Sequence, residues 1–237
     1  SVSYCYGIEA INNLGNPAAL IGHSLGEYTA LCLSGYLNFK DALKVIAVRG
    51  EEMHKAVENS NTTMAAVLTG DLETTIKEIE KLNNQGIQIW ISNFNDPSQI
   101  VISSYIDDMN YLKSNPKALG AKRVIPLEVA GAFHTEIVSS AKKPLEDTLN
   151  SIDISEGKIP VYMNVDAKKV EVSTLKENLV NQIDNSVLFN QQIEFVNNDI
   201  DPDLWCHIGP GNVTAGMVRK SISYKDLKVI NSLESSK

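Results

Sequence analysis

The sequence lacks both a long hydrophobic run and a surplus of basic residues. No apolar stretch approaches the roughly 20 residues that a membrane helix needs, and no signal-peptide pattern opens the chain, so we expect no membrane partner. The 29 acidic residues outnumber the 21 basic ones, which gives a formal net charge of −8. Because this balance leaves no cationic surplus to neutralise phosphates, nucleic acid is not an expected partner either. One well-placed arginine can still bind a single anion.

Cysteine is scarce, and the few histidines are spread out. The three cysteines, Cys5, Cys32 and Cys206, are odd in number, scattered and placed in apolar stretches. This pattern predicts buried thiols in a reducing compartment such as the cytoplasm, and not a disulfide framework. No cysteine has metal-ligand spacing and the four histidines do not cluster, so neither a metal nor another cofactor is expected.

What is present is an ordinary composition in a chain of moderate length. Of the 237 residues, 43% are hydrophobic and 21% are charged, which is typical of a globular protein. A chain of this length buries a sizeable core and has room for one large domain or two smaller ones.

The most informative stretch is residues 17–35, PAALIGHSLGEYTALCLSG. A short apolar run ends at Gly22, a segment with helical spacing begins after Ser24, and Gly26 follows two residues beyond the serine. This G-x-S-x-G pattern between a strand and a helix is typical of a nucleophile elbow, a turn so tight that its flanking residues favour glycine. The serine would stand at a helix N-terminus, where N–H groups stabilise an oxyanion. The alternative is a strand–turn–helix whose glycines serve close packing alone.

A change of pattern between residues 62 and 127 predicts a small module. Short strands and helices follow one another in the order βαββαβ, which is that of a ferredoxin-like module. The turn between its two central strands is expected at residues 95–97. Its second helix is expected over residues 107–119 despite Pro116.

This module is expected to be inserted into a larger domain. The hinges are expected at residues 59–62 and 127–131. The small domain then covers residues 61–127, and the large domain covers residues 1–60 and 128–237.

Periodic spacing of apolar residues predicts the elements of the larger domain. Tyr4, Ile8 and Ile11 are expected to form the apolar face of a first helix. The expected helices are residues 1–14, 39–58, 136–150, 175–183 and 189–197, and a buried strand is expected over residues 203–208.

The segment GHSLGEYTAL around Ser24 resembles the active-site segment of malonyl-CoA:acyl carrier protein transacylases and of the related acyltransferase domains of polyketide synthases. The resemblance implies an α/β fold with an α/β-hydrolase-like large domain that holds a parallel sheet and the elbow. It makes Ser24 the nucleophile and the backbone N–H of Leu25 an oxyanion donor. In this family a glycine- and glutamine-containing loop near the N-terminus supplies a second donor. No such loop is found here, so we expect a family member without its first segment.

Arg49 lies in the segment VRGEEM of the second expected helix. Helix statistics alone favour a solvated cation or a surface salt bridge. The resemblance implies instead that Arg49 binds the free carboxylate of the malonyl group. A guanidinium suits this task because its planar fork matches a carboxylate bidentately, which a lysine cannot do.

His134, in the segment GAFHT, resembles the catalytic histidine of the family. A lone histidine at such a junction is otherwise a helix-start or core residue. Family members that accept methylmalonyl usually carry YASH here, so Phe133 favours malonyl because its ring would crowd a branched α-carbon. The resemblance also implies that the backbone carbonyl of Gln182 orients the histidine, so that the side chain of Gln182 would matter little.

The stretch NFNDPSQ contains further candidates. The resemblance places Asn95 and Gln99 near the acyl pocket as substrate contacts, whereas Asn93 is interpreted as part of a hydrogen-bonded turn. The other histidines are interpreted as structural or supporting residues; they are His23, His54 and His207.

The function implied is transfer of malonyl from malonyl-CoA to the phosphopantetheine thiol of an acyl carrier protein, by a monomer that uses a Ser24–His134 dyad and ping-pong kinetics. The pathway is fatty acid or polyketide synthesis. Two alternatives stay open: a hydrolase that clears acyl chains from carrier proteins, and an inactive docking module.

Overall fold

The structure is a computed structural model that describes residues 2–223, 225–232 and 235. The α-helices are α1 Val2–Leu14, α2 Leu25–Ser34, α3 Phe39–Val57, α4 Leu72–Asn84, α5 Ile106–Ser114, α6 Lys142–Asn150, α7 Val172–Asn181, α8 Phe189–Ile200 and α9 Val213–Ser221. The 3-10 helices are η1 Pro116–Leu119 and η2 Glu136–Ala141. The strands are β1 Leu20–Ile21, β2 Thr62–Thr69, β3 Ile89–Asp96, β4 Gln99–Tyr105, β5 Ala121–Pro126, β6 Val161–Tyr162, β7 Leu204–Ile208 and β8 Asp226–Ile230. Among the described residues, no helix combines the length and apolar character needed to cross a membrane.

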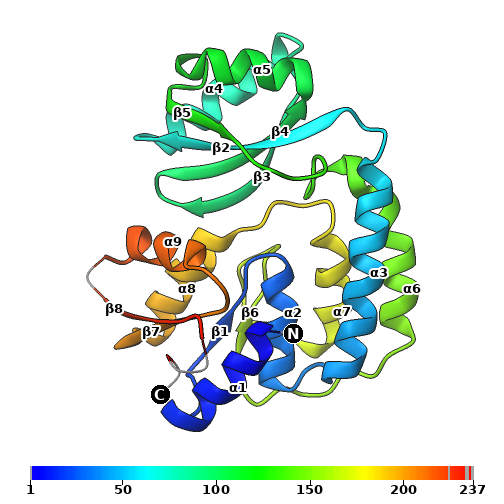
Figure 1. Cartoon of the computed structure of the whole chain (residues 1–237), viewed down its shortest axis with the longest axis vertical. Coiled ribbons are helices and arrows are strands. Elements are labelled where there is room, and N and C mark those ends of the chain that lie inside the picture. The colour runs from blue at the N-terminus through cyan, green and yellow to red at the C-terminus, as the bar shows by residue number, and fades with distance from the viewer. Residues whose placement is uncertain (1, 224, 233–234, 236–237) are drawn as a thin grey trace.

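Strands β2 to β5 form one antiparallel sheet with the order β3-β4-β2-β5, at one end of the long axis of the molecule (Figure 1). The predicted βαββαβ order is confirmed. Helices α4 and α5 cover the outer face of the sheet, where Ile79 and Leu82 join a core of their own (Figure 1). Helix α4 begins where the side chain of Asp71 accepts a hydrogen bond from the N–H of Thr74, a normal N-cap.

Two predicted boundaries in this sheet unit are wrong. Asn95 and Asp96 belong to strand β3, so the turn consists of Pro97 and Ser98. The expected helix over residues 107–119 is broken: α5 ends at Ser114, and the 3-10 helix η1 begins at Pro116. Proline lacks an N–H and disfavours the α conformation in the residue before it, which explains the break.

The rest of the chain is built on two short parallel strand pairs. β1 pairs with β6, and β7 pairs with β8. Helices α2, α3, α6 and α7 enclose one core, to which Leu31, Val45 and Leu145 contribute fully buried side chains. The expected helix over residues 136–150 begins as the 3-10 helix η2 and continues as α6.

A further core joins α8, α9 and the β7–β8 pair. The expected burial of residues 203–208 is wrong, because Trp205 is the buried residue of β7 while Leu204 and Cys206 on either side of it are exposed. Such alternation is typical of a strand with one solvent-facing side.

The predicted burial of the cysteines is also wrong. Cys5 and Cys206 are exposed, and Cys32 is partly buried against the core; all three are free thiols. The apolar neighbours in sequence misled the prediction, since Cys5 lies on the outer face of an amphipathic helix.

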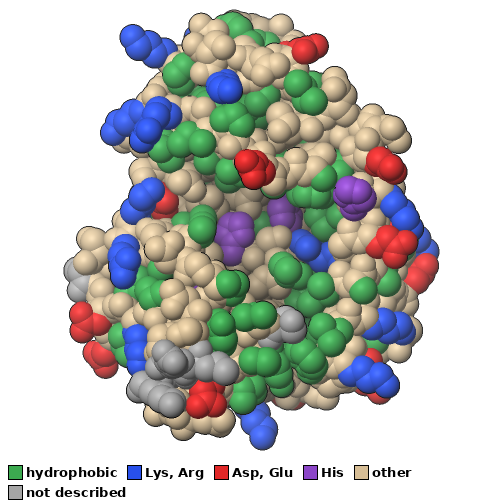
Figure 2. Space-filling view, in the orientation of Figure 1, with side chains coloured by type: hydrophobic (Ala, Val, Ile, Leu, Met, Phe, Trp, Pro, Cys, Tyr) green, Lys and Arg blue, Asp and Glu red, His purple; other side chains and the backbone are tan. Residues whose placement is uncertain are grey.

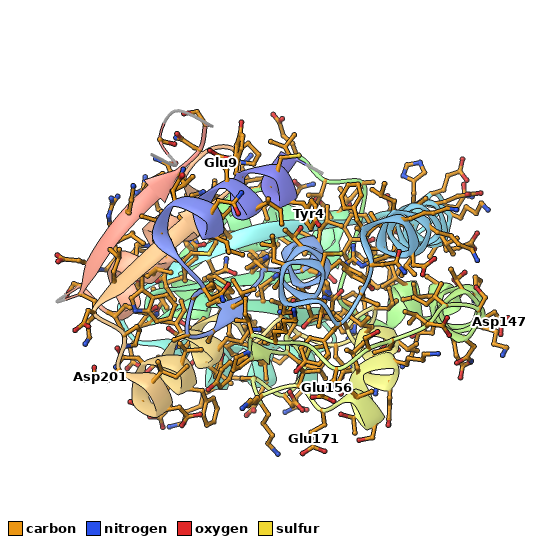
Figure 3. All side chains as sticks on the ribbon, turned by 90° about the horizontal axis from the view of Figure 1, so that it is seen from below. Tyr4, Glu9, Asp147, Glu156, Glu171 and Asp201 are labelled. Carbon is orange, nitrogen blue, oxygen red and sulfur yellow. The ribbon has the colours of Figure 1, made fainter. Side chains whose placement is uncertain are left out.

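Helix α1 turns a different face inward from the one predicted. Gly7 and Ala10 are its buried residues and Ile8 is exposed. A Cβ at Gly7 would lie 2.4 Å from the side chain of Leu33, so the small residues allow α1 to approach α2 closely. Tyr4 does face inward and stacks on a ring of α3, whereas acidic residues such as Glu9 are distributed around the outside (Figure 3).

Strand β3 attaches the sheet unit to the rest of the molecule. Its Phe94 N–H donates to the carbonyl of Val187 at 2.8 Å, and the Val187 N–H donates to the carbonyl of Ser92 at 2.9 Å. Lys220 of α9 adds an ion pair with the buried Asp96 at 3.1 Å. The surface is hollowed between the two parts, with histidine side chains in the hollow (Figure 2).

Candidate active site

The turn between β1 and α2 has the backbone of a strained elbow. Ser24 has φ 50° and ψ −106°, which is unusual for a residue with a side chain. A Cβ at Gly22 would lie 2.1 Å from the carbonyl carbon of Gly26 and 2.4 Å from the nitrogen of Glu27. A Cβ at Gly26 would have no atom within 4 Å among the described residues, apart from its chain neighbours and the backbone of its own helix. The close approach of strand and helix therefore requires glycine at position 22 and not at position 26.

Ser24 and His134 are brought together from positions 110 residues apart. The Ser24 Oγ lies 2.8 Å from His134 Nε2, and His134 Nδ1 lies 2.8 Å from the carbonyl oxygen of Gln182. Because a carbonyl only accepts, Nδ1 carries the proton and Nε2 is the acceptor for the serine hydroxyl. Burial, assisted by the nearby Arg49, lowers the pKa of His134 to about 3, so the imidazole is neutral at pH 7 and able to act as a base.

Arg49 reaches the same point from α3. Its Nη2 donates to Ser24 Oγ at 2.9 Å and to the side-chain Oε1 of Gln182 at 3.0 Å. The residue is 8% exposed and its guanidinium lies over the ring of Tyr28, 5.7 Å from the centroid. Among the described residues no carboxylate makes an ion pair with Arg49, and its buried Nε has no acceptor. The surface-cation alternative is therefore wrong for this residue.

The side chain of Gln182 makes more contacts within the site than the sequence indicated. It is fully buried at the C-terminus of α7. Besides accepting from Arg49, it donates from Nε2 to the carbonyl of Ser24 at 3.0 Å and to Glu27 Oε2 at 2.6 Å. The expectation that its side chain matters little is wrong, because both ends of the amide hold other residues of the site.

Comparison with known proteins identifies the family. The sequence pattern of the acyl transferase domain matches residues 5–234. This chain belongs to the acyl transferase domain family. The family predicted from GHSLGEYTAL is thus confirmed.

Malonyl-CoA:acyl carrier protein transacylases are among the proteins similar to this chain. The enzyme of Bacillus subtilis is 38% identical over 205 residues, which cover 86% of this chain and 64% of that protein. The enzyme of Staphylococcus aureus is 34% identical over 231 residues, which cover 97% of this chain and 74% of that protein. A solved malonyl-transacylase in complex with its type II polyketide synthase acyl carrier protein gives a TM-score of 0.90 at 28% identity, over 99% of this chain and 76% of that one. The chain therefore spans about two thirds to three quarters of these proteins.

Sequence reasoning missed two buried residues of the acyl transferase domain that support the elbow. Asn164, after β6, accepts from the Ser24 N–H at 2.8 Å and donates from Nδ2 to the Gly22 carbonyl at 2.6 Å. The backbone N–H of Asn164 donates to Glu27 Oε1 at 2.5 Å. Burial raises the pKa of Glu27 to about 8. An acidic residue within the apolar face of α2, beside the fully buried Tyr28, was the available signal for Glu27; no local pattern marks Asn164.

The candidate residues of the NFNDPSQ stretch contact the elbow through His23, the residue before the serine. Asn95 Oδ1 is 2.9 Å from His23 Nε2, which must carry the proton, and Asn95 Nδ2 donates to Gln99 Oε1 at 2.9 Å. His23 is partly buried, packs edge-on against Phe189, and burial lowers its pKa. Asn95 and Gln99 thus connect β3 to the elbow through His23, without a hydrogen bond to Ser24 among the described residues.

The remaining predicted residues take separate positions. Leu25 is 49% exposed at the first turn of α2, where the backbone N–H has no partner within the helix. Phe133 is partly buried and packs against the core that α2, α3, α6 and α7 enclose. His54 is exposed on α3, and His207 Nδ1 lies 2.6 Å from Thr214 Oγ1, away from the serine.

A cavity of about 440 Å³ opens beside His134. Its walls come from β3, from the start of η2 and from the segment after α7, and they include Trp90, Glu136 and Asp184. Two of these lining residues are bonded to each other, since Trp90 Nε1 donates to Glu136 Oε1 at 3.0 Å. Within the described part of the chain, no group of three or more His, Cys, Asp or Glu residues could hold a metal ion.

Proposed function

We propose that this chain transfers a malonyl group from malonyl-CoA to the phosphopantetheine thiol of an acyl carrier protein, in fatty acid or polyketide synthesis. The observation that carries the proposal is Arg49, a buried cation that has no carboxylate partner among the residues the structure describes and lies 2.9 Å from the Ser24 hydroxyl. A buried, unpaired guanidinium is costly unless a ligand supplies the anion. A malonyl group attached to Ser24 has a free carboxylate one methylene away from the ester carbonyl, within reach of such a fork.

In the first half-reaction, His134 Nε2 removes the proton from Ser24 as Oγ attacks the thioester carbonyl. The backbone N–H of Leu25 holds the oxyanion at the N-terminus of α2. The tetrahedral intermediate collapses, the carbon–sulfur bond breaks, and His134 returns its proton to the coenzyme A thiolate. Gln182, by accepting from Nδ1, stabilises the imidazolium that forms between these steps.

In the second half-reaction, the phosphopantetheine thiol takes the place of coenzyme A. His134 removes the thiol proton, the sulfur attacks the malonyl-serine ester, and the proton returns to Ser24 Oγ as the ester bond breaks. We assign Asn95, which bonds His23, and Gln99, which accepts from Asn95, to the wall of the acyl pocket. We assign Phe133 to the exclusion of branched acyl groups. The solved complex of a similar transacylase with its carrier protein supports a carrier protein as the acceptor.

The proposal includes two domains with different roles. The large domain, residues 1–60 and 128–237, is an α/β-hydrolase-like unit that carries Ser24 and His134. The small domain, residues 61–127, is a ferredoxin-like unit that forms the opposite wall of the hollow. Their separate hydrophobic cores support this division.

The test is mass spectrometry of the intact protein after mixing with malonyl-CoA. The expected result is one malonyl adduct on Ser24, lost when a holo acyl carrier protein is added and absent in Ser24→Ala. A protein that releases malonate to water without loading the carrier would be the hydrolase, and a protein that shows no adduct would be the docking module. Either result contradicts the proposal.

A further inference from the structure

One side-chain amide links a buried glutamate to a buried arginine behind the Ser24–His134 pair. Glu27 comes from α2 and Arg49 from α3. Gln182 lies between them: its Nε2 donates to Glu27 Oε2 at 2.6 Å, and its Oε1 accepts from Arg49 Nη2 at 3.0 Å. Glu27 and Gln182 are both fully buried, so water does not compete for these contacts.

The amide of Gln182 has one possible orientation because every neighbour of its Nε2 is an acceptor. These neighbours are Glu27 Oε2, the Ser24 carbonyl at 3.0 Å and Asn164 Oδ1 at 3.3 Å. The Asn164 oxygen is itself fixed, since it accepts from the Ser24 N–H at 2.8 Å. A reversed amide would set its oxygen against the Ser24 carbonyl and Asn164 Oδ1, which only accept, and its NH₂ against the guanidinium. Glu27 Oε2 makes the shortest of the three contacts, at 2.6 Å, and so adds most to the observed orientation.

We infer that Glu27 is a positioning residue for the acyl-binding arginine. It fixes the Gln182 amide, whose Oε1 then holds the Arg49 guanidinium against Ser24, and this sets the preference for acyl groups that carry a free carboxylate. The inference rests on the proposed function, in which Arg49 binds that carboxylate.

The guanidinium geometry explains how one hydrogen bond can have this effect. Nη2 of Arg49 has two N–H bonds, and Ser24 Oγ and Gln182 Oε1 accept from it at 2.9 Å and 3.0 Å. Because the guanidinium is rigid and planar, fixing one end fixes the plane of the other N–H groups. An acetyl group makes no use of that plane, whereas a malonyl carboxylate needs it for two parallel hydrogen bonds.

The decisive experiment compares malonyl-CoA with acetyl-CoA as acyl donors to Ser24. Glu27→Gln replaces an acceptor by a group that can also donate, and Gln182→Met removes the amide while keeping the backbone carbonyl that binds His134. Each variant should lower the ratio of kcat/KM for malonyl-CoA over acetyl-CoA by about 10- to 100-fold, the worth of a hydrogen bond to a charged group. The matched control is Gln192→Met. Gln192 is another fully buried glutamine that bonds Asn164 and the Tyr162 carbonyl but not Arg49.

The control should lose stability without changing the substrate ratio. An unchanged ratio in Glu27→Gln and Gln182→Met, or an equal fall in Gln192→Met, would overturn the inference, because the network would then be structural only.

A spectroscopic readout separates this inference from the proposed function. In protein labelled with nitrogen-15 arginine, the held guanidinium of Arg49 should give distinct, slowly exchanging Nη resonances, assigned by their loss in Arg49→Lys. These resonances should merge in Glu27→Gln and in Gln182→Met and persist in Gln192→Met. Persistence in Glu27→Gln refutes the positioning role. Absence of malonyl loading in the wild type refutes the proposed function, while the spectra still decide the position of the guanidinium.

Discussion

Replacing Gly22 by alanine tests the close approach on which the elbow depends. The added Cβ would lie 2.1 Å and 2.2 Å from the carbonyl carbon and oxygen of Gly26 and 2.4 Å from the nitrogen of Glu27. All three are main-chain atoms of the first turn of α2, so no side-chain rotation relieves the overlap. Restoring an ordinary contact of about 3.5 Å requires β1 and α2 to separate by about 1 Å or more.

That separation acts directly on Ser24, which lies between the two elements. Its Oγ is held 2.8 Å from His134 and 2.9 Å from Arg49, and both partners are carried by other segments. A displacement of about 1 Å at a reacting group can cost about 10²-fold in rate. Overpacking of this kind also typically lowers the free energy of unfolding by about 1–3 kcal/mol.

Gly26→Ala is the matched control, because it makes the same chemical change on the other side of the serine. Apart from its chain neighbours and its own helix backbone, no described atom would lie within 4 Å of a Cβ at position 26. Alanine is also favoured over glycine in a helix by about 0.5–1 kcal/mol. The assay is the rate of malonyl loading on Ser24 by intact mass, with urea unfolding of each variant. Gly22→Ala should load far more slowly than Gly26→Ala, which should keep wild-type stability or exceed it. Wild-type loading by Gly22→Ala, or an equal loss in Gly26→Ala, would refute the argument.

Three further predictions follow from the geometry. Burial, with a smaller contribution from the charge of Arg49, lowers the pKa of His134 to about 3. The loading rate should therefore stay constant as pH falls past the ordinary histidine pKa of about 6.5. A titration near pH 6.5 in the pH profile of kcat/KM for loading would contradict this. The same shift means that the unfolded chain binds a proton at His134 that the native chain does not. His134 should therefore lower the free energy of unfolding as pH drops below about 6.5, by up to about 1.4 kcal/mol per unit, against the opposite contribution of Glu27, whose pKa is raised to about 8. Urea titrations should show this slope reduced in His134→Gln, and an identical slope would count against it. Asn164→Ala should lower the free energy of unfolding by about 1–3 kcal/mol for each buried group left unpaired, and it should also slow loading. The control is Asn190→Ala, at a buried site bonded to Glu194 and Ser221, which should lower stability alone. Equal activity in the two variants would argue against support of the elbow by Asn164.

The sequence predicted the elements with strong local signals and missed those that depend on distant partners. The elbow and the Ser24–His134 contact were predictable because the G-x-S-x-G pattern and the family resemblance mark both residues. Glu27 and Asn164 were not, because their roles arise from hydrogen bonds between positions 137 and 140 residues apart. Burial of Cys206 was mispredicted for a related reason: the side of a strand that faces solvent depends on which helices pack against it.

The parallel bridge between β3 and Val187 limits how the four-stranded sheet can move against the rest of the molecule. The four-stranded sheet is anchored on both sides of the hollow, by the chain crossings at one side and by two main-chain hydrogen bonds and the Lys220–Asp96 pair at the other. The sheet therefore cannot rotate away from the rest of the molecule about a single hinge without breaking those contacts. In the proposed function, the thioester arm would pass a fixed frame, with Trp90 among the residues that line the cavity beside His134.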